Sequence, residues 1–175
     1  KSSVFLRNRV QGEAGCIQIT NNKILTAKNS KFIQNKAFTS GVIHLQKSEI
    51  CKFHGCLFLQ NIADQISAVG QITDAKTFSV RNSSIVSNTL TVTNNYFSFG
   101  KVEIYGSLTV EDTDHIFFSH CSFRNNVGIS MASALAIINA KSFCFDDGIL
   151  GSNKGASGGA LSLDNTVFIS IKSSI

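Results

Sequence analysis

Side chains suited to acid–base chemistry are sparse in this 175-residue chain. The acidic residues cluster at Asp146-Asp147 and in the run Glu111-Asp112-Thr113-Asp114. Polysaccharide lyases and hydrolases need carboxylates gathered on one face, as general acid and base or as ligands of calcium. Both clusters fall in connections, where Asp is a common turn residue. We therefore expect no catalytic residue and no cofactor here, unless a neighbouring segment adds a third carboxylate to make a calcium site.

The cysteines and histidines show no metal-binding pattern either. The five cysteines lack a CxxC pair, which argues against a four-thiolate zinc site and against a full disulfide framework. Strand alternation would turn Cys51 and Cys56 inward and His54 outward, and this arrangement prevents tetrahedral coordination. We predict no metal site. Cys144 has an outward phase and is the thiol expected to react.

The elements that position these side chains follow a repeat of 26–27 residues. Its mark is Phe-x-x-Asn, with an aliphatic residue in place of Phe in two of the six copies. Each copy contains three short alternating segments separated by Gly, Ser and Asn turns, without a helical period. The recurrent asparagines are spaced 27, 26, 27, 38 and 27 residues apart: Asn8, Asn35, Asn61, Asn88, Asn126 and Asn153.

This repeat predicts an all-β fold, a right-handed parallel β-helix of about six to seven rungs with one inserted hairpin. A single rung cannot bury its own apolar face, whereas rungs stacked about 4.8 Å apart pair their backbones and build a continuous core. Residues 1–175 would form a single segment, and Val167 to Ile171 would begin a seventh copy. Because Lys1 already lies inside a repeat, we expect the segment to belong to a longer protein.

The six asparagines are predicted to form a structural ladder along the rod. Asn tolerates left-handed backbone angles, which suits a turn, and identical stacked amides can hydrogen-bond to one another. The aligned phenylalanines, such as Phe32 and Phe58, are expected to stack inside the rod.

The 38-residue gap between Asn88 and Asn126 predicts an insertion at residues 89–104, interpreted as a protruding loop or hairpin. Insertions in solenoids often form the binding face, and exposed aromatic rings are typical anchors. The alternative is that these rings fold back onto the rod. The candidate binding residues of the insertion are Tyr96, Phe97, Phe99 and Lys101.

Charge is distributed unevenly along the chain. Residues 1–60 hold nine Lys or Arg against two Glu, and residues 61–175 hold seven against nine acidic residues. A basic face attracts a polyanion or an acidic partner, although scattered lysines also discourage edge aggregation. No pattern of a nucleic-acid-binding protein and no apolar stretch long enough to span a membrane is present. Asn82 begins the N-glycosylation sequon Asn82-Ser83-Ser84 at an outward position.

The Phe-x-x-Asn element followed by Gly-Gly-Ala-Leu, most complete between Leu150 and Leu163, resembles the repeats of the polymorphic outer membrane proteins. The resemblance implies a pectin-lyase-like β-helix, an extracellular or cell-surface location and a role in adhesion. We therefore expect a structural or adhesive segment that serves as a rigid binding scaffold. Its expected partners are other protein chains or further rungs at both ends, with glycans as a further candidate. The alternative is a carbohydrate-active enzyme, a polysaccharide lyase or hydrolase, because this architecture also hosts such enzymes.

Overall fold

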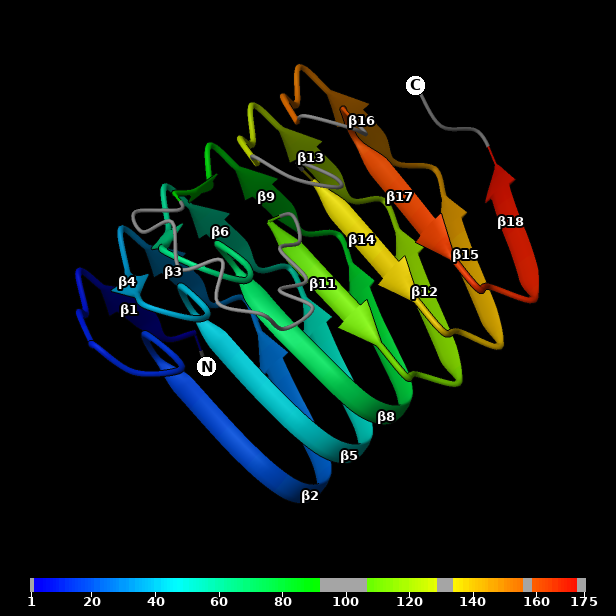
Figure 1. The fold of residues 1–175 in the computed structure, drawn as a ribbon, viewed down its shortest axis with the longest axis horizontal. Helices are drawn as coiled ribbons and strands as arrows, with labels where there is room; N and C mark the ends of the chain where they lie inside the picture. The colour runs from blue at the N-terminus through cyan, green and yellow to red at the C-terminus, as the bar shows by residue number, and fades with distance from the viewer. Residues whose placement is uncertain (1, 92–106, 129–133, 156–158, 173–175) are drawn as a thin grey trace, which may run out of the picture.

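The computed structural model describes residues 2–91, 107–128, 134–155 and 159–172, and these form a parallel β-solenoid (Figure 1). Its eighteen strands contain two to twelve residues, and no helix is present in these ranges. Strands from successive copies of the repeat lie side by side and run parallel, as β3 (Lys31–Ile33) and β6 (Leu57–Leu59) do. The predicted all-β, parallel solenoid is confirmed.

Three sheets run along the solenoid. The first sheet contains β1 (Val4–Leu6), β3 (Lys31–Ile33), β6 (Leu57–Leu59), β9 (Ser84–Val86), β13 (Ser122–Arg124) and β16 (Ile149–Gly151). The second contains β4 (Lys36–Ala37), β7 (Ile62–Ala63) and β10 (Thr89–Leu90). The third contains β2 (Ile17–Lys28), β5 (Ile43–His54), β8 (Gly70–Arg81), β11 (Leu108–Glu111), β12 (His115–Ser119), β14 (Leu135–Ile138), β15 (Ser142–Asp146), β17 (Leu161–Asp164) and β18 (Phe168–Lys172).

The number of turns is slightly smaller than expected. Five successive parallel pairings join the six strands of the first sheet, so the chain makes about five turns and not six to seven rungs. The segment expected to begin a seventh copy lies in β18, which pairs with β15 and ends the third sheet. A turn is counted from one strand to the equivalent strand of the next copy, so six stacked copies make five turns.

Three corners of the rung are formed by residues with left-handed backbone angles, whereas the connections between the second and third sheets at residues 38–42 and 64–69 contain none. The described residues with positive φ fall into three columns, one for each of these corners. The columns are Asn21, Lys47, Asp74, Asp112, Asn139 and Asn165; Asn29, Gly55, Asn82, His120 and Asp147; and Arg7, Gln34, Gln60, Ser87, Asn125 and Ser152. In the third column the left-handed residue precedes the recurrent asparagine. The expectation that these asparagines themselves adopt left-handed angles was therefore wrong.

The recurrent asparagines form hydrogen bonds from rung to rung, and Asn61 shows the pattern. Its Oδ1 accepts from the backbone N and from the Nδ2 of Asn35, both at 3.0 Å. Its Nδ2 donates to the carbonyl oxygen of Phe32 at 3.0 Å and to Oδ1 of Asn88 at 2.9 Å. Asn35, Asn61, Asn88 and Asn126 are 0% exposed. The side chain of Asn61 uses all four of its hydrogen-bonding positions, which is what a buried amide requires.

Aromatic rings fill the interior next to the amides. Phe32 is stacked between Phe5 and Phe58, with ring centroids 4.8 and 4.9 Å apart and nearly parallel planes. Farther along the stack Phe118 packs edge-on against Phe123 at 5.6 Å. Repetition of one ring per rung at the strand spacing produces this stacking, which adds to the gain from burial.

The run of small residues in each repeat allows neighbouring rungs to approach closely. A Cβ on Gly41 would lie 2.0 Å from the carbonyl oxygen of Ala68, and one on Gly15 would lie 2.1 Å from the carbonyl oxygen of Gly41. No side chain fits at either distance without moving the backbone of the next rung. Glycine is therefore required at these two positions.

The extra residues of the long copy lie between Leu90 and Leu108. Leu90 is opposite Ala63, 27 residues earlier, whereas Leu108 is opposite Gly70, 38 residues earlier. Thr89 and Leu90 were expected to belong to the insertion at 89–104, but they pair with β7 as a regular strand because the rung register continues through them. The proposed contact residues lie outside the described residues: Tyr96, Phe97, Phe99 and Lys101.

Candidate binding groove

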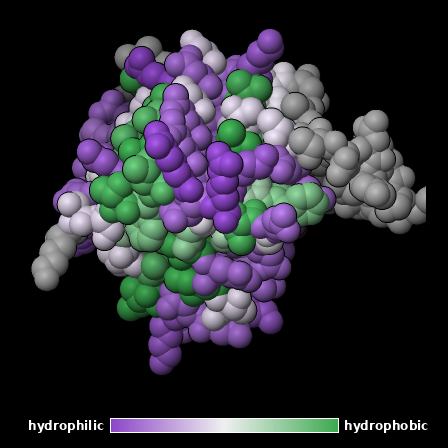
Figure 2. Space-filling view, turned by 90° about the vertical axis from the view of Figure 1, so that its left-hand side faces the viewer, coloured by the Kyte–Doolittle hydropathy of each residue, from purple (hydrophilic) through white to green (hydrophobic). Residues whose placement is uncertain are grey.

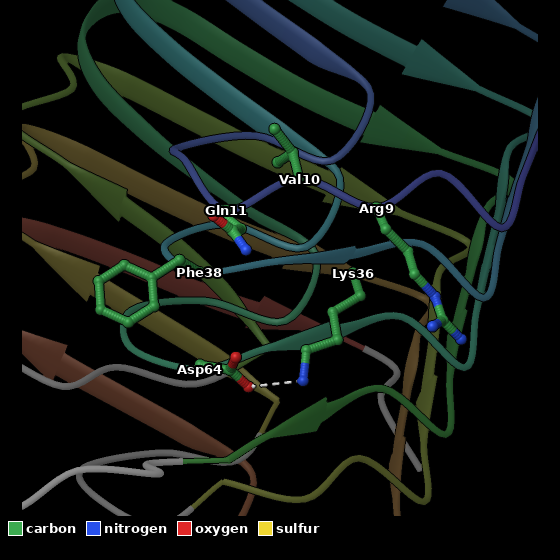
Figure 3. Close-up of a pocket in the computed structure, with 6 residues that line it drawn as sticks. All are labelled: Arg9, Val10, Gln11, Lys36, Phe38 and Asp64. Atoms are coloured by element: carbon green, nitrogen blue, oxygen red, sulfur yellow. Dashed lines mark ion pairs between the residues drawn. The ribbon is translucent and has the colours of Figure 1, made fainter.

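An open groove of about 630 Å³ lies on the outer surface of the second sheet, and Figure 3 shows the residues that line it. It is near the end of the stack where β1 and β2 lie (Figure 1). Three consecutive copies of the repeat contribute to it. Its lining residues are Arg9, Val10, Gln11, Lys36, Phe38 and Asp64.

The parallel register places these residues in neighbouring columns. Arg9 pairs with Lys36 across adjacent rungs, which sets their backbones about 4.8 Å apart. Gln11, Phe38 and Asp64 follow two positions later in their copies. The intervening column contains Val10, Ala37 and Ala63; the two alanines are fully buried, while Val10 in the outermost copy is exposed and also lines the groove. Alternation along the strand therefore turns the two polar columns outward together.

Lys36 and Asp64 form an ion pair on the floor of the groove (Figure 3). The distance from Lys36 Nζ to Asp64 Oδ1 is 3.2 Å. The hydroxyl of Thr91 donates to the same oxygen at 2.8 Å. The carboxylate is mostly buried and the ammonium group is about half exposed. These contacts fix the position of the Asp64 side chain, while Oδ2 receives no hydrogen bond from the described residues.

Arg9 and Phe38 lie on opposite sides of this ion pair in Figure 3. Arg9 is exposed, and no acceptor among the described residues contacts its guanidinium group. The ring of Phe38 is 38% exposed, in contrast to the buried rings of the core. A guanidinium binds carboxylate or sulfate through two parallel hydrogen bonds. The groove thus offers, on one surface, a guanidinium group that no described acceptor contacts and an accessible aromatic ring.

The acidic clusters of the sequence lie at the corners of the rungs and are engaged there. Asp112 accepts a hydrogen bond from Asn139 at 3.0 Å, and Asp114 pairs with Lys141 at 2.8 Å. The hydrogen bond from Lys141 is the main cause that lowers the pKa of Asp114 below its ordinary value. In the described ranges no three His, Cys, Asp or Glu side chains lie close enough to hold a metal ion.

A Ser–His–Asp chain at another corner had no signature in the sequence. Ser119 Oγ lies 2.6 Å from His120 Nδ1, and His120 Nε2 lies 3.1 Å from Asp147 Oδ2. Nucleophilic hydrolases use this order of groups. Ser119 is only 9% exposed, however, so a substrate carbonyl has little access to its hydroxyl. We interpret this series of hydrogen-bonded side chains as a structural link between two rungs.

The cysteines are all free thiols. Burial raises the pKa of Cys16 to about 11 and also raises the pKa of Cys51, Cys56 and Cys121. A raised pKa lowers the thiolate fraction at neutral pH, and the thiolate is the reactive species. Cys144 is partly exposed.

The groove residues were not recognised in the sequence, although a signal for them exists. Arg9 and Lys36 each follow a recurrent asparagine directly, and Gln11, Phe38 and Asp64 stand three positions after one. An alignment of the first three copies at the positions one and three residues after the asparagine would have placed the cations beside the polar and aromatic residues.

Asn82, the glycosylation candidate, is exposed at a corner.

The fold and the groove define the class of protein: a parallel β-solenoid that carries an open groove, lined by charged and apolar side chains, on its outer surface. No family model, no curated protein and no solved structure matches the chain. In the described part of the chain, no helix is long and apolar enough to cross a bilayer.

Proposed function

We propose that this chain is a structural or adhesive segment of a surface or extracellular protein and serves as a rigid binding scaffold. The observation that carries the proposal is the groove itself, in which Arg9 and Phe38 are exposed on a frame held by buried amides. A rigid backbone frame loses little conformational entropy when a ligand binds. Such a surface is suited to recognition.

We further propose that the repeat is of the polymorphic outer membrane protein type within the pectin-lyase-like superfamily. The proposal is supported by the column of stacked Phe rings and the adjacent ladder of Asn amides, because these give a structural role to both recurrent positions of the repeat motif Phe-x-x-Asn. A location at the cell surface is part of the same proposal.

Partner chains or further rungs are proposed to pack against the two ends of the stack. Ile169 and Ile171 continue the columns of Phe143 and Phe145, yet they are 47% and 51% exposed. At the other end, apolar and polar surfaces are interleaved (Figure 2), and the inward-facing Phe5 is only partly buried, whereas its neighbour Phe32 is fully buried. Apolar side chains in inward phase favour a covering layer. The insertion residues remain a second proposed contact: Tyr96, Phe97, Phe99 and Lys101.

The alternative function, a polysaccharide lyase or hydrolase, has one observation in its favour, namely that Asp64 lies in a groove with two cations. A hydrolase needs a second carboxylate across the scissile bond, and Asp64 is the one acidic residue among those that line the groove. An assay on immobilised acidic and neutral glycans separates the two functions. Retention of the chain without release of sugar supports the scaffold. Release of new reducing or unsaturated ends, abolished by Asp64→Asn, supports the enzyme.

A further inference from the structure

We infer that the groove binds an anionic saccharide, a sugar chain bearing carboxylate or sulfate groups; this inference rests on the proposed scaffold function. The reasons are the charge of the groove, its exposed aromatic ring and the hydrogen bonds already made by its backbone.

The charge of the groove favours an anion. Two cations, Arg9 and Lys36, face one carboxylate, Asp64, which is already paired with Lys36. Arg9 therefore retains its full capacity for a bidentate contact with a carboxylate or sulfate group. A ligand without an acidic group would leave this capacity unused.

The remaining side chains are suited to a sugar ring. The exposed face of Phe38 offers an apolar platform for the C–H face of a pyranose. Oδ2 of Asp64 is free to accept a hydrogen bond from a hydroxyl group, and the amide of Gln11 lines the same groove. A volume of about 630 Å³ lies within the usual range for small-ligand sites.

The backbone of the inner copies argues against a peptide strand added over them. The backbone N–H of Lys36 donates to Asn8 at 2.8 Å, that of Asp64 to Phe38 at 3.0 Å and that of Thr91 to Ala63 at 2.8 Å. Strand addition depends on free backbone groups at a sheet edge. Because these donors are engaged within the solenoid, a ligand that lies over Lys36, Phe38 and Asp64 is recognised by side chains, as in saccharide binding.

The test is isothermal titration calorimetry of the 175-residue chain with three hexasaccharides. Hyaluronan provides carboxylates alone, heparin adds sulfates, and chitohexaose is neutral. We expect the acidic probes to bind with an affinity that falls as salt is raised, and chitohexaose to bind at least tenfold more weakly. The difference between hyaluronan and heparin identifies the preferred acid group.

Three variants locate the binding. Arg9→Gln should weaken acidic-probe binding about tenfold or more, since a charge-assisted bond is lost. Phe38→Ala should weaken it about fivefold through loss of stacking. Lys154→Gln is the matched control, because Lys154 belongs to the column of Arg9 and Lys36 but lies at the far end of the stack; it should change affinity less than about twofold.

The inference is overturned if no acidic probe binds, if chitohexaose binds equally well, or if Arg9→Gln and Lys154→Gln have equal effects. The scaffold function survives each of these outcomes if the chain is still retained by another glycan or protein through a surface that Arg9→Gln does not affect. It fails separately if a saccharide is degraded.

Discussion

The substitution Asn61→Ala tests whether the buried amide ladder stabilises the solenoid. The substitution removes four side-chain hydrogen bonds of 2.9–3.0 Å at a site with no exposure. The backbone N–H of Asn35 and one hydrogen of its amide then lack acceptors inside the protein. At about 1–3 kcal/mol for each buried unsatisfied donor, the expected loss is about 4 kcal/mol of the free energy of unfolding.

Urea unfolding followed by far-ultraviolet circular dichroism measures this loss. Asn8→Ala is the matched control, because Asn8 belongs to the same ladder but is exposed. Its amide donates to Asn35 at 2.9 Å, and water can replace that bond, so we expect a loss of about 1 kcal/mol. Equal losses for the two variants would refute the argument that burial gives the ladder its strength.

A second variant, Asn61→Asp, adds a pH signature to the same test. The new carboxyl oxygen would face the acceptor oxygens of Phe32 and Asn88, so only the protonated form can donate a hydrogen bond. Burial and these acceptors should raise the folded-state pKa above the unfolded value of about 3.9. Stability of the variant is then highest below about pH 4 and falls as pH rises toward the folded-state pKa. A pH-independent difference from the parent chain would contradict this picture.

Three further predictions concern other positions. Gly41→Ala should lower stability by about 3 kcal/mol, because its Cβ would meet a backbone oxygen of the next rung, whereas Gly12→Ala, with nothing within 4 Å, should be nearly neutral in thermal unfolding. In a thiol-reactivity assay, Cys144 should react first, and Cys144→Ser should abolish the fast phase. Lys141→Met should raise the pKa of Asp114 toward its ordinary value, as measured by NMR titration of the carboxyl group. The contribution of ionised Asp114, present above its unfolded-state pKa and lost as pH falls through its lowered folded-state pKa, should then become smaller, since His115 and Lys76 also lower this pKa.

The register of the solenoid could be predicted because it is written directly in the spacing of the asparagines. The intervals of 27, 26, 27, 38 and 27 residues reappear as the separations of the hydrogen-bonded amides. The corners could not be predicted in the same way. Arg7, Gln34 and Gln60 adopt left-handed angles, although their side chains give them no preference for this region. Hydrogen bonding to the neighbouring rung overrides the local preference there.

The groove shows the same division. Arg9, Lys36 and Asp64 come from three copies of the repeat, and none of them is unusual in its own segment. They become one surface only when the rungs are stacked in register, so that the two outward columns of the same strands lie side by side.

The sequence by itself determined the period, the parallel register and the inward columns of Phe and Asn, because strand alternation and rung spacing follow from local backbone geometry. The tertiary structure decided which residue takes each corner angle, where the long copy leaves the register and which outward side chains meet in the groove. Those features depend on contacts between rungs about 27 residues apart in the chain, which local preferences do not encode.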